Sequence, residues 1–533
     1  MLQLLLGGSG SGKTTLLYQR IRARAEKGEK SILLVPEQFT SSTEGRIYRE
    51  LGDALSGMVE SFSFTSLAEK ILSTEGGAAV QTLSDAGRAV LVRRALEELQ
   101  DNVHYYHRHR RSAAFCQMAA QTIDELKSAG LSGQQLAQLA GACGAESGKL
   151  SELALIFQGY ETLLARSGMD PSDRLELAGA RLEEALARHS LPEFLRDRAV
   201  FIDEFDTFNA PKKRLLGAML AALPSVTVAL CDDGAPLLPG DLSLFSGAKQ
   251  VAAQLRQLAR KNGAEVAVPQ LLRKDLRHRN APGLAAVAEL LETGSCTADA
   301  PAGEVRLFAA PSREEEARAA AGAIRRLMRQ GVRCGKIAVV CRDIAKYRAA
   351  VRYEFRMAEI PLYCDEPTTP EFSAPATAVR ALLEIARGAD LTENLTTLAK
   401  TGLCALSEEQ VCALENYAYT WAPTAAAWRE KFERSPKGFG EQELTEEDLR
   451  NRERAEHARA LLVGAVDAFR AKVRGVNAEA ISRAVYFCLK TLGAEEQQAA
   501  QVKAIRAGRG IPAAEEAARE WNVVMGLLNE MAH

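Results

Sequence analysis

The chain has 533 residues, of which 47% are hydrophobic and 26% are charged. At roughly 150 residues per domain, this length predicts three to four domains, and the composition is typical of globular proteins, which excludes disordered and fibrous classes. The 67 Lys and Arg residues nearly balance the 69 Asp and Glu residues, for a net charge of −2. No overall basic field attracts a polyanion, so any contact with nucleic acid must come from local patches.

The cysteines and the apolar segments exclude further classes. The ten cysteines are spread along the chain without a CxxC or similarly tight pair, which argues against a zinc or iron–sulfur site. The apolar stretch 2–6 has no basic flank, unlike a signal peptide. No segment approaches the roughly 20 apolar residues of a membrane span. The sequence therefore predicts a soluble, cytoplasmic protein with reduced thiols and no membrane partner.

Short apolar runs alternate with helical patterns in the first 75 residues. This alternation predicts βα units that build a parallel sheet. From about residue 84 to residue 189 the pattern is almost wholly helical, and strand signals then return. The expected strands are 2–6, 32–35, 58–64, 199–202, 226–230 and 265–268, and the first expected helices are 13–27, one after Thr40 and one from Ser66. We therefore expect a discontinuous α/β domain over 1–80 and 190–295, with a helical insertion over 81–189.

A second group of elements follows the segment 293–303, which is the best linker candidate because Gly, Ser, Thr and Pro are concentrated there. Apolar runs at 305–309, 337–340 and 362–363 alternate with helices near 314–328 and 347–357. This pattern predicts the start of a second α/β domain over 303–373. From 374 to 533 only helices are expected, as a second helical insertion.

The strongest motif lies between the first expected strand and the first expected helix. It is a full match to the P-loop pattern GxxxxGK[ST] and consists of Gly7, Gly8, Ser9, Gly10, Ser11, Gly12, Lys13 and Thr14. Glycines let backbone N–H groups turn toward phosphate oxygens, and the helix that follows adds its positive end. We expect Lys13 to reach the β- and γ-phosphates of ATP and Thr14 to bind Mg²⁺ through its hydroxyl. A glycine-rich turn without a ligand is the alternative.

A strand that ends in two acids completes the expected nucleotide site. The run 199–202 is followed by Asp203 and Glu204. We expect Asp203 to be the carboxylate on the metal side and Glu204 to be the catalytic residue that orients the attacking water. An acidic turn after a core strand is the simpler alternative. Together the motifs predict an α/β fold of the P-loop NTPase class, with a RecA-like parallel sheet and large α-helical insertions.

Residues 131–135, Leu-Ser-Gly-Gln-Gln, are similar to the ABC-transporter signature LSGGQ. Gln134 replaces the second glycine, and the segment lies far before Asp203, whereas ABC domains place the two motifs close together. A transport ATPase is therefore not expected.

Segments along most of the chain resemble those of UvrD-like superfamily 1 helicases. Residues 203–209, Asp-Glu-Phe and a polar cluster, resemble their motif II, and 59–68 resembles the strand and helix start that carry their Thr-Phe-His-Ser-Leu motif. Within that superfamily the chain most resembles the AddB family, the second subunits of AddAB helicase–nucleases of bacterial double-strand-break repair. Besides the P-loop, the matching segments are 34–40, 201–205, 311–316, 414–417 and 521–525 with 527–528.

The resemblance implies a specific organisation and role. It implies helicase-type motor domains, with 1A over 1–80 and 190–295, 1B over 81–189, the start of 2A over 303–373 and 2B over 374–533. It implies repair of DNA double-strand breaks by homologous recombination, through binding of ATP and single-stranded DNA and Chi-type recognition. The implied partners are an AddA-type helicase/nuclease subunit, in a heterodimer, and single- and double-stranded DNA. The family's nuclease domain and its iron–sulfur cluster are expected only in a C-terminal part outside these residues.

Two departures from the motor pattern leave the activity open. The expected strand 226–230 continues into Cys231, Asp232, Asp233 and Gly234, without the glutamine of the Gly-Asp-x-x-Gln motif that couples nucleotide to DNA. The arginine that completes the ATP site of such motors is not found before His533. Besides an ATP-binding repair subunit, two alternatives remain: a non-hydrolysing DNA-recognition scaffold with a structural P-loop, and a P-loop ATPase unrelated to DNA.

Candidate DNA contacts are few. The run 104–111, His-Tyr-Tyr-His-Arg-His-Arg-Arg, combines cations with aromatic rings, as phosphate contact and base stacking require. A solvated helix face or a metal site are its alternatives. By resemblance Phe64 and Ser66 line a single-strand path, although a core position for Phe64 is an equal alternative. Three arginines fall where superfamily 1 motors carry an arginine motif, and they are Arg273, Arg277 and Arg279. The arginines of 325–333 are expected to face solvent.

Overall fold

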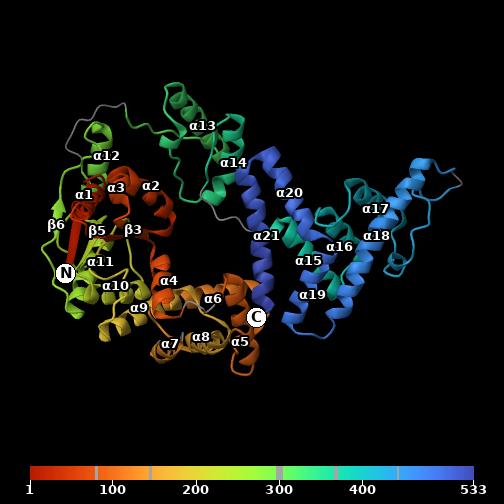
Figure 1. Ribbon diagram of the computed structural model, residues 1–533, viewed down its shortest axis with the longest axis horizontal. Coiled ribbons are helices and arrows are strands. Elements are labelled where there is room, and N and C mark those ends of the chain that lie inside the picture. The colour runs from red at the N-terminus through yellow and green to blue at the C-terminus, as the bar shows by residue number, and fades with distance from the viewer. Residues whose placement is uncertain are drawn as a thin grey trace. The chain divides into compact units, whose positions relative to one another are not determined.

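The computed structural model describes residues 1–77, 82–142, 144, 147–295, 304–364, 370–440 and 443–532. These residues form two compact units, Met1–Arg306 and Leu307–His533 (Figure 1). Most of the expected linker, residues 296–303, lies outside the described residues. None of the described helices combines the length and the apolar character that crossing a membrane requires.

The first unit is built on a six-stranded parallel sheet, with the strand order β3-β2-β4-β5-β1-β6. The strands are β1 (Leu2–Gly7), β2 (Ser31–Leu34), β3 (Val59–Phe62), β4 (Ala199–Ile202), β5 (Ser225–Cys231) and β6 (Gln270–Leu272). Leu2 lies opposite Val226 on β5, and β4 inserts between β2 and β5. The chain thus returns to its first sheet after a long helical segment, and the α/β fold class is confirmed.

Helices cover both faces of this sheet (Figure 1). Leu4 and Leu6 belong to the core on one face, whereas Leu5 belongs to the core on the other, and all three are at most 4% exposed. A sheet buried on both faces requires strands that are apolar on both sides, which explains the unbroken apolar run of β1. The first face is covered by α4 (Phe64–Glu75), α10 (Ala210–Ala222) and α11 (Ser246–Lys261), and the second by α1 (Lys13–Ala25), α2 (Thr40–Leu51) and the short α3 (Asp53–Ser56).

The last strand begins later than expected. Residues 265–268 form only a single bridge, between Val266 and Leu2, and β6 pairs with β1 from Gln270 onward. Pro269 lies between the two, and a proline has no N–H for the ladder and restricts the residue before it. Val268 is accordingly 87% exposed. The strand expected at 265–268 is therefore wrong, and a short edge strand replaces it.

Between β3 and β4 the described chain is mainly helical. The helices are α5 (Asp85–Glu98), α6 (Ala113–Ser128), α7 (Gly133–Ala140), α8 (Ser147–Ser167) and α9 (Pro171–Ala187). Helices α5 to α8 surround a core of their own, in which Phe157 and Tyr160 are at most 1% exposed. Helix α9 instead contributes Leu175 and Leu182 to the core on the sheet's face, next to α4 and α10. It therefore connects the helical segment to the sheet.

A buried ionic cluster holds these helices together. The Lys127 ammonium donates hydrogen bonds to carboxylate oxygens of Asp170 and Asp173, each at 2.8 Å. The Tyr160 hydroxyl donates to the other oxygen of Asp170 at 2.6 Å. Burial disfavours the ammonium, but the two carboxylates outweigh it and raise the pKa of Lys127. The two carboxylates therefore favour the charged form of the Lys127 side chain.

The strands expected after the linker do not form. Residues 305–309, 337–340 and 362–363 are in no strand, and Leu307, Val340 and Tyr363 are 102%, 91% and 88% exposed. A strand is stabilised by backbone hydrogen bonds to a neighbouring strand, and these segments have no such neighbour in the part of the chain that the structure describes. The expectation of a second sheet is therefore wrong for these residues, although the two expected helices are present.

Two cores stabilise the second unit. A small one lies between α13 (Arg313–Arg329) and α14 (Ile344–Met357) and includes Phe355. A larger one surrounds the fully buried Trp428. The helices that contribute to the larger core are α15 (Ala374–Arg387), α16 (Leu391–Lys400), α17 (Glu408–Trp421), α18 (Glu446–Lys472), α19 (Ala478–Thr491), α20 (Ala494–Arg509) and α21 (Ile511–Ala532). The expectation of helices beyond residue 374 is confirmed for the described residues.

Candidate nucleotide-binding site

The glycine-rich loop joins the end of β1 to the start of α1. β1 ends at Gly7 and α1 begins at Lys13. Gly10 and Gly12 have φ angles of 80° and 90°, in the left-handed region that residues with a Cβ rarely adopt. Gly12 is the N-cap of α1 and has no side chain to cap the first turn, so the N–H groups of that turn are open to another acceptor. The loop thus has the backbone of an anion cradle.

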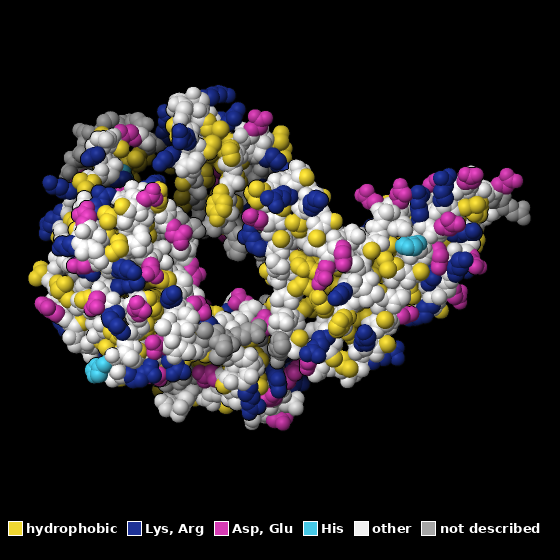
Figure 2. All heavy atoms as spheres, viewed as in Figure 1, with side chains coloured by type: hydrophobic (Ala, Val, Ile, Leu, Met, Phe, Trp, Pro, Cys, Tyr) yellow, Lys and Arg dark blue, Asp and Glu magenta, His cyan; other side chains and the backbone are white. Residues whose placement is uncertain are grey.

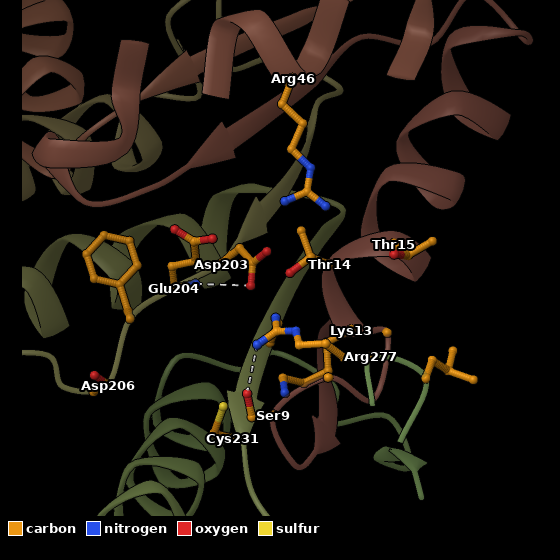
Figure 3. A pocket seen from close by; sticks show the side chains of 15 residues that line it. Ser9, Lys13, Thr14, Thr15, Arg46, Asp203, Glu204, Asp206, Cys231 and Arg277 are labelled. Carbon is orange, nitrogen blue, oxygen red and sulfur yellow. Dashed lines mark hydrogen bonds between the residues drawn. The ribbon is translucent and has the colours of Figure 1, made fainter. Parts of the chain in front are cut away.

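Two side chains of α1 face the loop and the cavity beside it. The Lys13 ammonium donates hydrogen bonds to the carbonyl oxygens of Gly7 and Gly8, both at 2.8 Å. Thr14 and Asp203 line the same cavity, and their side chains lie near each other in Figure 3. The sequence motif therefore places its cation and its hydroxyl where a phosphate–metal group could meet both.

The segment after β6 packs directly against the loop. The N–H groups of Leu276 and Arg277 donate to the Gly10 carbonyl at 3.0 and 3.3 Å. A Cβ on Gly10 would lie 2.7 Å from the Cβ of Arg277 and 2.9 Å from a carboxylate oxygen of Asp275. Gly10 is therefore required for two reasons, its φ angle and this close approach.

The carboxyl end of β4 supplies the first acid. Asp203 is 6% exposed, and its backbone N–H donates to the Leu34 carbonyl at 3.1 Å, which extends the pairing of β4 with β2. One of its carboxylate oxygens accepts a hydrogen bond from the Glu204 N–H at 3.0 Å. The carboxyl ends of parallel strands meet at one edge of the sheet, and this geometry brings Asp203 to the loop that follows β1.

Glu204 has an unusual backbone and a perturbed carboxyl group. Its φ of 65° is in the left-handed region, where a non-glycine residue is uncommon and often marks a functional position. Partial burial raises the pKa of the Glu204 carboxyl, the neighbouring Asp203 raises it further, and Arg46 opposes both. Two adjacent acids with separate environments are the pattern expected of a metal ligand beside a base.

Two guanidinium groups complete a cavity of about 410 Å³ between the loop and the acids. Arg277 donates a hydrogen bond to the Ser9 hydroxyl at 3.2 Å. Arg46, from α2, points toward Thr14 and Asp203 (Figure 3). Its guanidinium lies 4.9 Å from the centre of the Tyr18 ring, and burial raises the pKa of the Tyr18 hydroxyl to about 12 despite that cation. The cavity thus combines fixed cations with a carboxylate pair.

Sequence reasoning missed Arg46 and left the role of Arg277 open. Arg46 belongs to no motif, and its only signal was its position on the helix that follows the carboxyl end of β2. Arg277 was singled out by its place before the second unit, and it lines the cavity, whereas Arg273 and Arg279 do not.

The two candidates for a single-strand path have other roles in this structure. Phe64 is 3% exposed and packs edge-on against Phe205 and Phe208, with ring centres 5.2 and 6.0 Å apart. Ser66 forms a capping box with Ser63 at the start of α4. Phe64 therefore occupies the core, and Ser66 stabilises a helix end.

The segment after β5 turns back on itself. Asp232 is 3% exposed, its carboxylate accepts a hydrogen bond from the Gly234 N–H at 2.7 Å, and its own N–H donates to the Gly7 carbonyl at 3.3 Å. Partial desolvation raises the pKa of its carboxyl group. Asp232 thus ties the end of β5 to the base of the glycine-rich loop.

Two other segments have local structural roles. In the segment similar to the ABC signature, Ser132 and Gln135 form the capping box of α7. On α13, Arg326 and Arg329 are exposed, whereas Ala321 and Ile324 are buried. The first segment is a helix start, and the arginines of the second face solvent as expected.

Comparisons with known proteins agree on one family. The family model described as "ADDB, N-terminal" matches residues 4–288. A protein of Desulforudis audaxviator, named as the B subunit of an ATP-dependent helicase/deoxyribonuclease, is 32% identical over 446 residues, which are 80% of this chain and 37% of that protein. Proteins with the same name from Moorella thermoacetica and Symbiobacterium thermophilum are 29% and 31% identical, over 99% and 81% of this chain and 47% and 38% of their own lengths. The chain spans less than half the length of these relatives.

Proposed function

Because the chain belongs to the AddB N-terminal family, we propose that it is the ATP- and DNA-binding portion of the AddB-type subunit of an ATP-dependent helicase/deoxyribonuclease. In this role it acts in the cytoplasm in the repair of DNA double-strand breaks by homologous recombination, with Chi-type recognition. Its partners are an AddA-type helicase/nuclease subunit and single- and double-stranded DNA. The nuclease and its iron–sulfur cluster belong to parts of the whole subunit that these residues do not include. The observation that carries the proposal is the convergence of the loop 7–14 with Asp203 and Glu204 at one sheet edge.

The residues of the cavity fit ATP and Mg²⁺. Gly12 leaves the first turn of α1 without a side-chain cap, so the N–H groups of that turn are free to bind phosphate oxygens beside the cavity. The loop 7–12 and Lys13 would hold the phosphates. Thr14 and Asp203 offer the oxygen ligands that Mg²⁺ prefers. When bound, the metal would neutralise part of the charge of the phosphates.

Glu204 is suited to act on water in this site. Glu204 directly follows Asp203 in the chain and lines the same cavity. Its N–H donates a hydrogen bond to the Asp203 carboxylate. In its ionised form it can accept a proton or a hydrogen bond from a water molecule aligned with the terminal phosphate. Arg46 and Arg277 would offset negative charge on that phosphate. These roles make hydrolysis chemically feasible with side chains of the first unit alone.

A non-hydrolysing scaffold is the second candidate, and one observation favours it. The end of β5 lacks the coupling glutamine of superfamily 1 motors, and Asp232 is engaged in its own turn with Gly234. Nucleotide binding without coupled translocation is compatible with this arrangement. The third alternative, an ATPase unrelated to DNA, has no observation in its favour.

A titration with a fluorescent ATP analogue in the presence of Mg²⁺ tests the nucleotide site. Lys13→Ala removes a phosphate-binding cation, and we expect its affinity for the analogue to fall at least tenfold, in line with the loss of a charge-assisted hydrogen bond. Lys27→Ala is the matched control, because Lys27 is exposed just after the same helix. Equal affinities of wild type and Lys13→Ala would exclude a functional nucleotide site. Measuring phosphate release on the same samples separates hydrolysis from the scaffold alternative.

A further inference from the structure

The loop between α5 and α6 carries the basic and aromatic run 104–111 at the surface of the first unit. Its residues 107–109 form a single 3-10 turn rather than a helix face, which corrects one alternative considered from the sequence. Together with the start of α6, the loop lines a surface pocket of about 690 Å³. We call the residues that line it the loop pocket, and they are Tyr105, Tyr106, Arg108, His109, Ser112, Ala114, Phe115 and Met118.

Aromatic rings form one wall of the loop pocket. The Tyr105 and Tyr106 rings meet edge to face with centres 5.0 Å apart, and Tyr106 and His109 lie 5.2 and 5.9 Å from the Phe115 ring. Tyr105 and Met118 are 61% and 57% exposed. Phe115 anchors the group because it packs against the core of α5 to α8. The exposed ring of Tyr105 is therefore held by Tyr106, which in turn packs against Phe115.

One carboxylate on α8 holds the backbone of the loop. Glu152 accepts hydrogen bonds from three successive N–H groups, those of His104, Tyr105 and Tyr106, at 2.8 to 3.1 Å. Successive N–H groups that converge on one carboxylate fix the local backbone and partly compensate the carboxylate's charge. The entropy cost of ordering the backbone of the two tyrosines is therefore already met before any ligand arrives.

The ionisable side chains of the run 104–111 are all basic or tyrosine. The run 104–111 contains three arginines and three histidines and no acid. Within the described residues, the guanidinium groups of Arg108, Arg110 and Arg111 form no ion pair. On the face of the molecule that Figure 2 shows, basic and acidic side chains are interspersed. The loop is thus a local exception on a chain whose net charge is near zero.

These properties favour a single-stranded polyanion over a metal ion. Among the described residues, no group of three or more His, Cys, Asp and Glu side chains is arranged to hold a metal. Exposed rings beside unpaired arginines match the stacking platforms and backbone contacts of single-strand binding sites. Duplex DNA cannot use the rings in this way, because its bases are already stacked on each other.

We infer that the loop pocket is a binding site for single-stranded DNA, in which a base stacks on Tyr105 and the adjacent phosphates contact Arg108 and its neighbouring arginines. The inference rests on the proposed function, which identifies the polymer as DNA. It adds that the helical segment 85–187 would contact this DNA at the loop pocket. The rings of Tyr106, His109 and Phe115 support Tyr105, and Glu152 is a positioning residue for the loop.

The test compares two loop variants with two matched controls by fluorescence anisotropy of a labelled oligothymidylate. Tyr105→Ala should weaken binding roughly 5- to 150-fold, which is the effect of removing one base–aromatic stack. Arg108→Ala should weaken binding and lower the slope of log K against log salt by about 0.7, the value for one lost phosphate contact on a single strand. Arg352→Ala and Tyr353→Ala are the controls, because they are exposed neighbours on α14; both should bind as wild type does.

A spectroscopic variant separates stacking from a merely structural effect. Tyr105→Trp keeps an aromatic face, so it should retain affinity, and its added fluorescence should be quenched when the oligonucleotide binds. Tyr105→Ala should unfold at the wild-type temperature, since the Tyr105 ring is mostly exposed. An unquenched Tyr105→Trp protein that still binds DNA would overturn the stacking role.

The outcomes distinguish this inference from the proposed function. If the wild-type protein binds no single-stranded DNA at low salt, the DNA-binding part of the proposed function fails. If it binds and the loop variants match the α14 controls, only the loop pocket is excluded and the proposed function stands. An equal loss of affinity for duplex and single-stranded DNA would also overturn the stacking account. Loss of binding to an AddA-type protein with unchanged DNA affinity would identify the loop as a protein interface instead.

Discussion

Glu204 is the residue whose protonation state most directly limits the proposed chemistry. Partial burial and Asp203 raise its pKa above the ordinary glutamate value of about 4.3. Only the ionised carboxylate can accept a proton from water. The rate of hydrolysis should therefore be maximal above this raised pKa and should fall as the pH decreases through it. The measurement is the pH dependence of phosphate release by the wild-type protein.

Replacement of the same carboxyl provides the control for that profile. Glu204→Gln should lower the hydrolysis rate by about 10²- to 10⁴-fold and leave binding of the Mg²⁺–ATP analogue near the wild-type value. Glu37→Gln, at an exposed position, should change neither. An acidic limb at the ordinary glutamate pKa, or an unchanged rate in Glu204→Gln, would contradict the assignment of the base.

Arg46 gives a second prediction, because its charge acts on the cavity in two ways. It lowers the pKa of Glu204, and its guanidinium points toward Thr14 and Asp203, where the proposed site would hold the terminal phosphate. Arg46→Ala should therefore shift the acidic limb of the pH profile upward and lower kcat by about 10²- to 10³-fold, as expected for loss of a charge-stabilising donor. Arg49→Ala, one turn further along α2, is the control. A lowered affinity for ATP with an unchanged kcat would show that Arg46 binds the ground state and the transition state equally and does not act on the chemical step.

The turn between β1 and α1 depends on glycine for its shape. Gly10→Ala should lower the free energy of unfolding by more than the ~1–2 kcal/mol that a left-handed conformation costs, since the new Cβ would also lie 2.7 Å from the Cβ of Arg277. Gly28→Ala is the matched control, because Gly28 has a similar φ of 77° with nothing within 4 Å of its added Cβ. Urea unfolding of both variants isolates the steric contribution, and equal losses would show that the loop and the segment after β6 are not in close contact.

The packing of the inserted helices depends on the Lys127 cluster. Lys127→Ala would leave Asp170, whose side chain is 1% exposed, without its cation. Removal of one partner of a buried ion pair costs about 3–5 kcal/mol, so we expect a loss of that size in the free energy of unfolding. Arg94→Ala breaks an exposed pair with Glu98 on α5 and should cost less than ~1 kcal/mol. Similar losses for the two variants would show that the cluster adds no stability beyond that of a surface pair.

At the level of the whole chain, positive and negative charges nearly cancel, so binding of ATP or DNA must depend on local groups of basic side chains. Basic and acidic residues nearly cancel, with a net charge of −2, and the visible face mixes both signs (Figure 2). The cavity arginines Arg46 and Arg277 and the basic run 104–111 all belong to the first unit. The proposed nucleotide and DNA contacts therefore both fall within residues 1–306, and the described residues of the second unit are mainly helical.

The sequence alone predicted the parts of this protein whose conformation depends on residues that are adjacent in the chain. The loop 7–14 could be recognised because its backbone geometry depends on local glycines, and β1, β2, β4 and β5 could be placed because buried parallel strands are short, continuous apolar runs. The acids after β4 followed from the same logic, since a strand end in a parallel sheet points to a known edge.

The tertiary structure decided which distant side chains meet and which apolar runs become strands. Arg46 and Arg277 reach the cavity from α2 and from the segment after β6. No local sequence pattern predicts that these two residues meet there. Residues 305–309 and 337–340 have the composition of strands, yet a strand forms only when another strand pairs with its backbone, and none does so among the described residues. Likewise Phe64 became a core residue because Phe205 and Phe208 lie against it. Local conformation can be read from neighbouring residues, whereas burial, pairing and the electrostatics of a cavity depend on contacts between residues far apart in the chain.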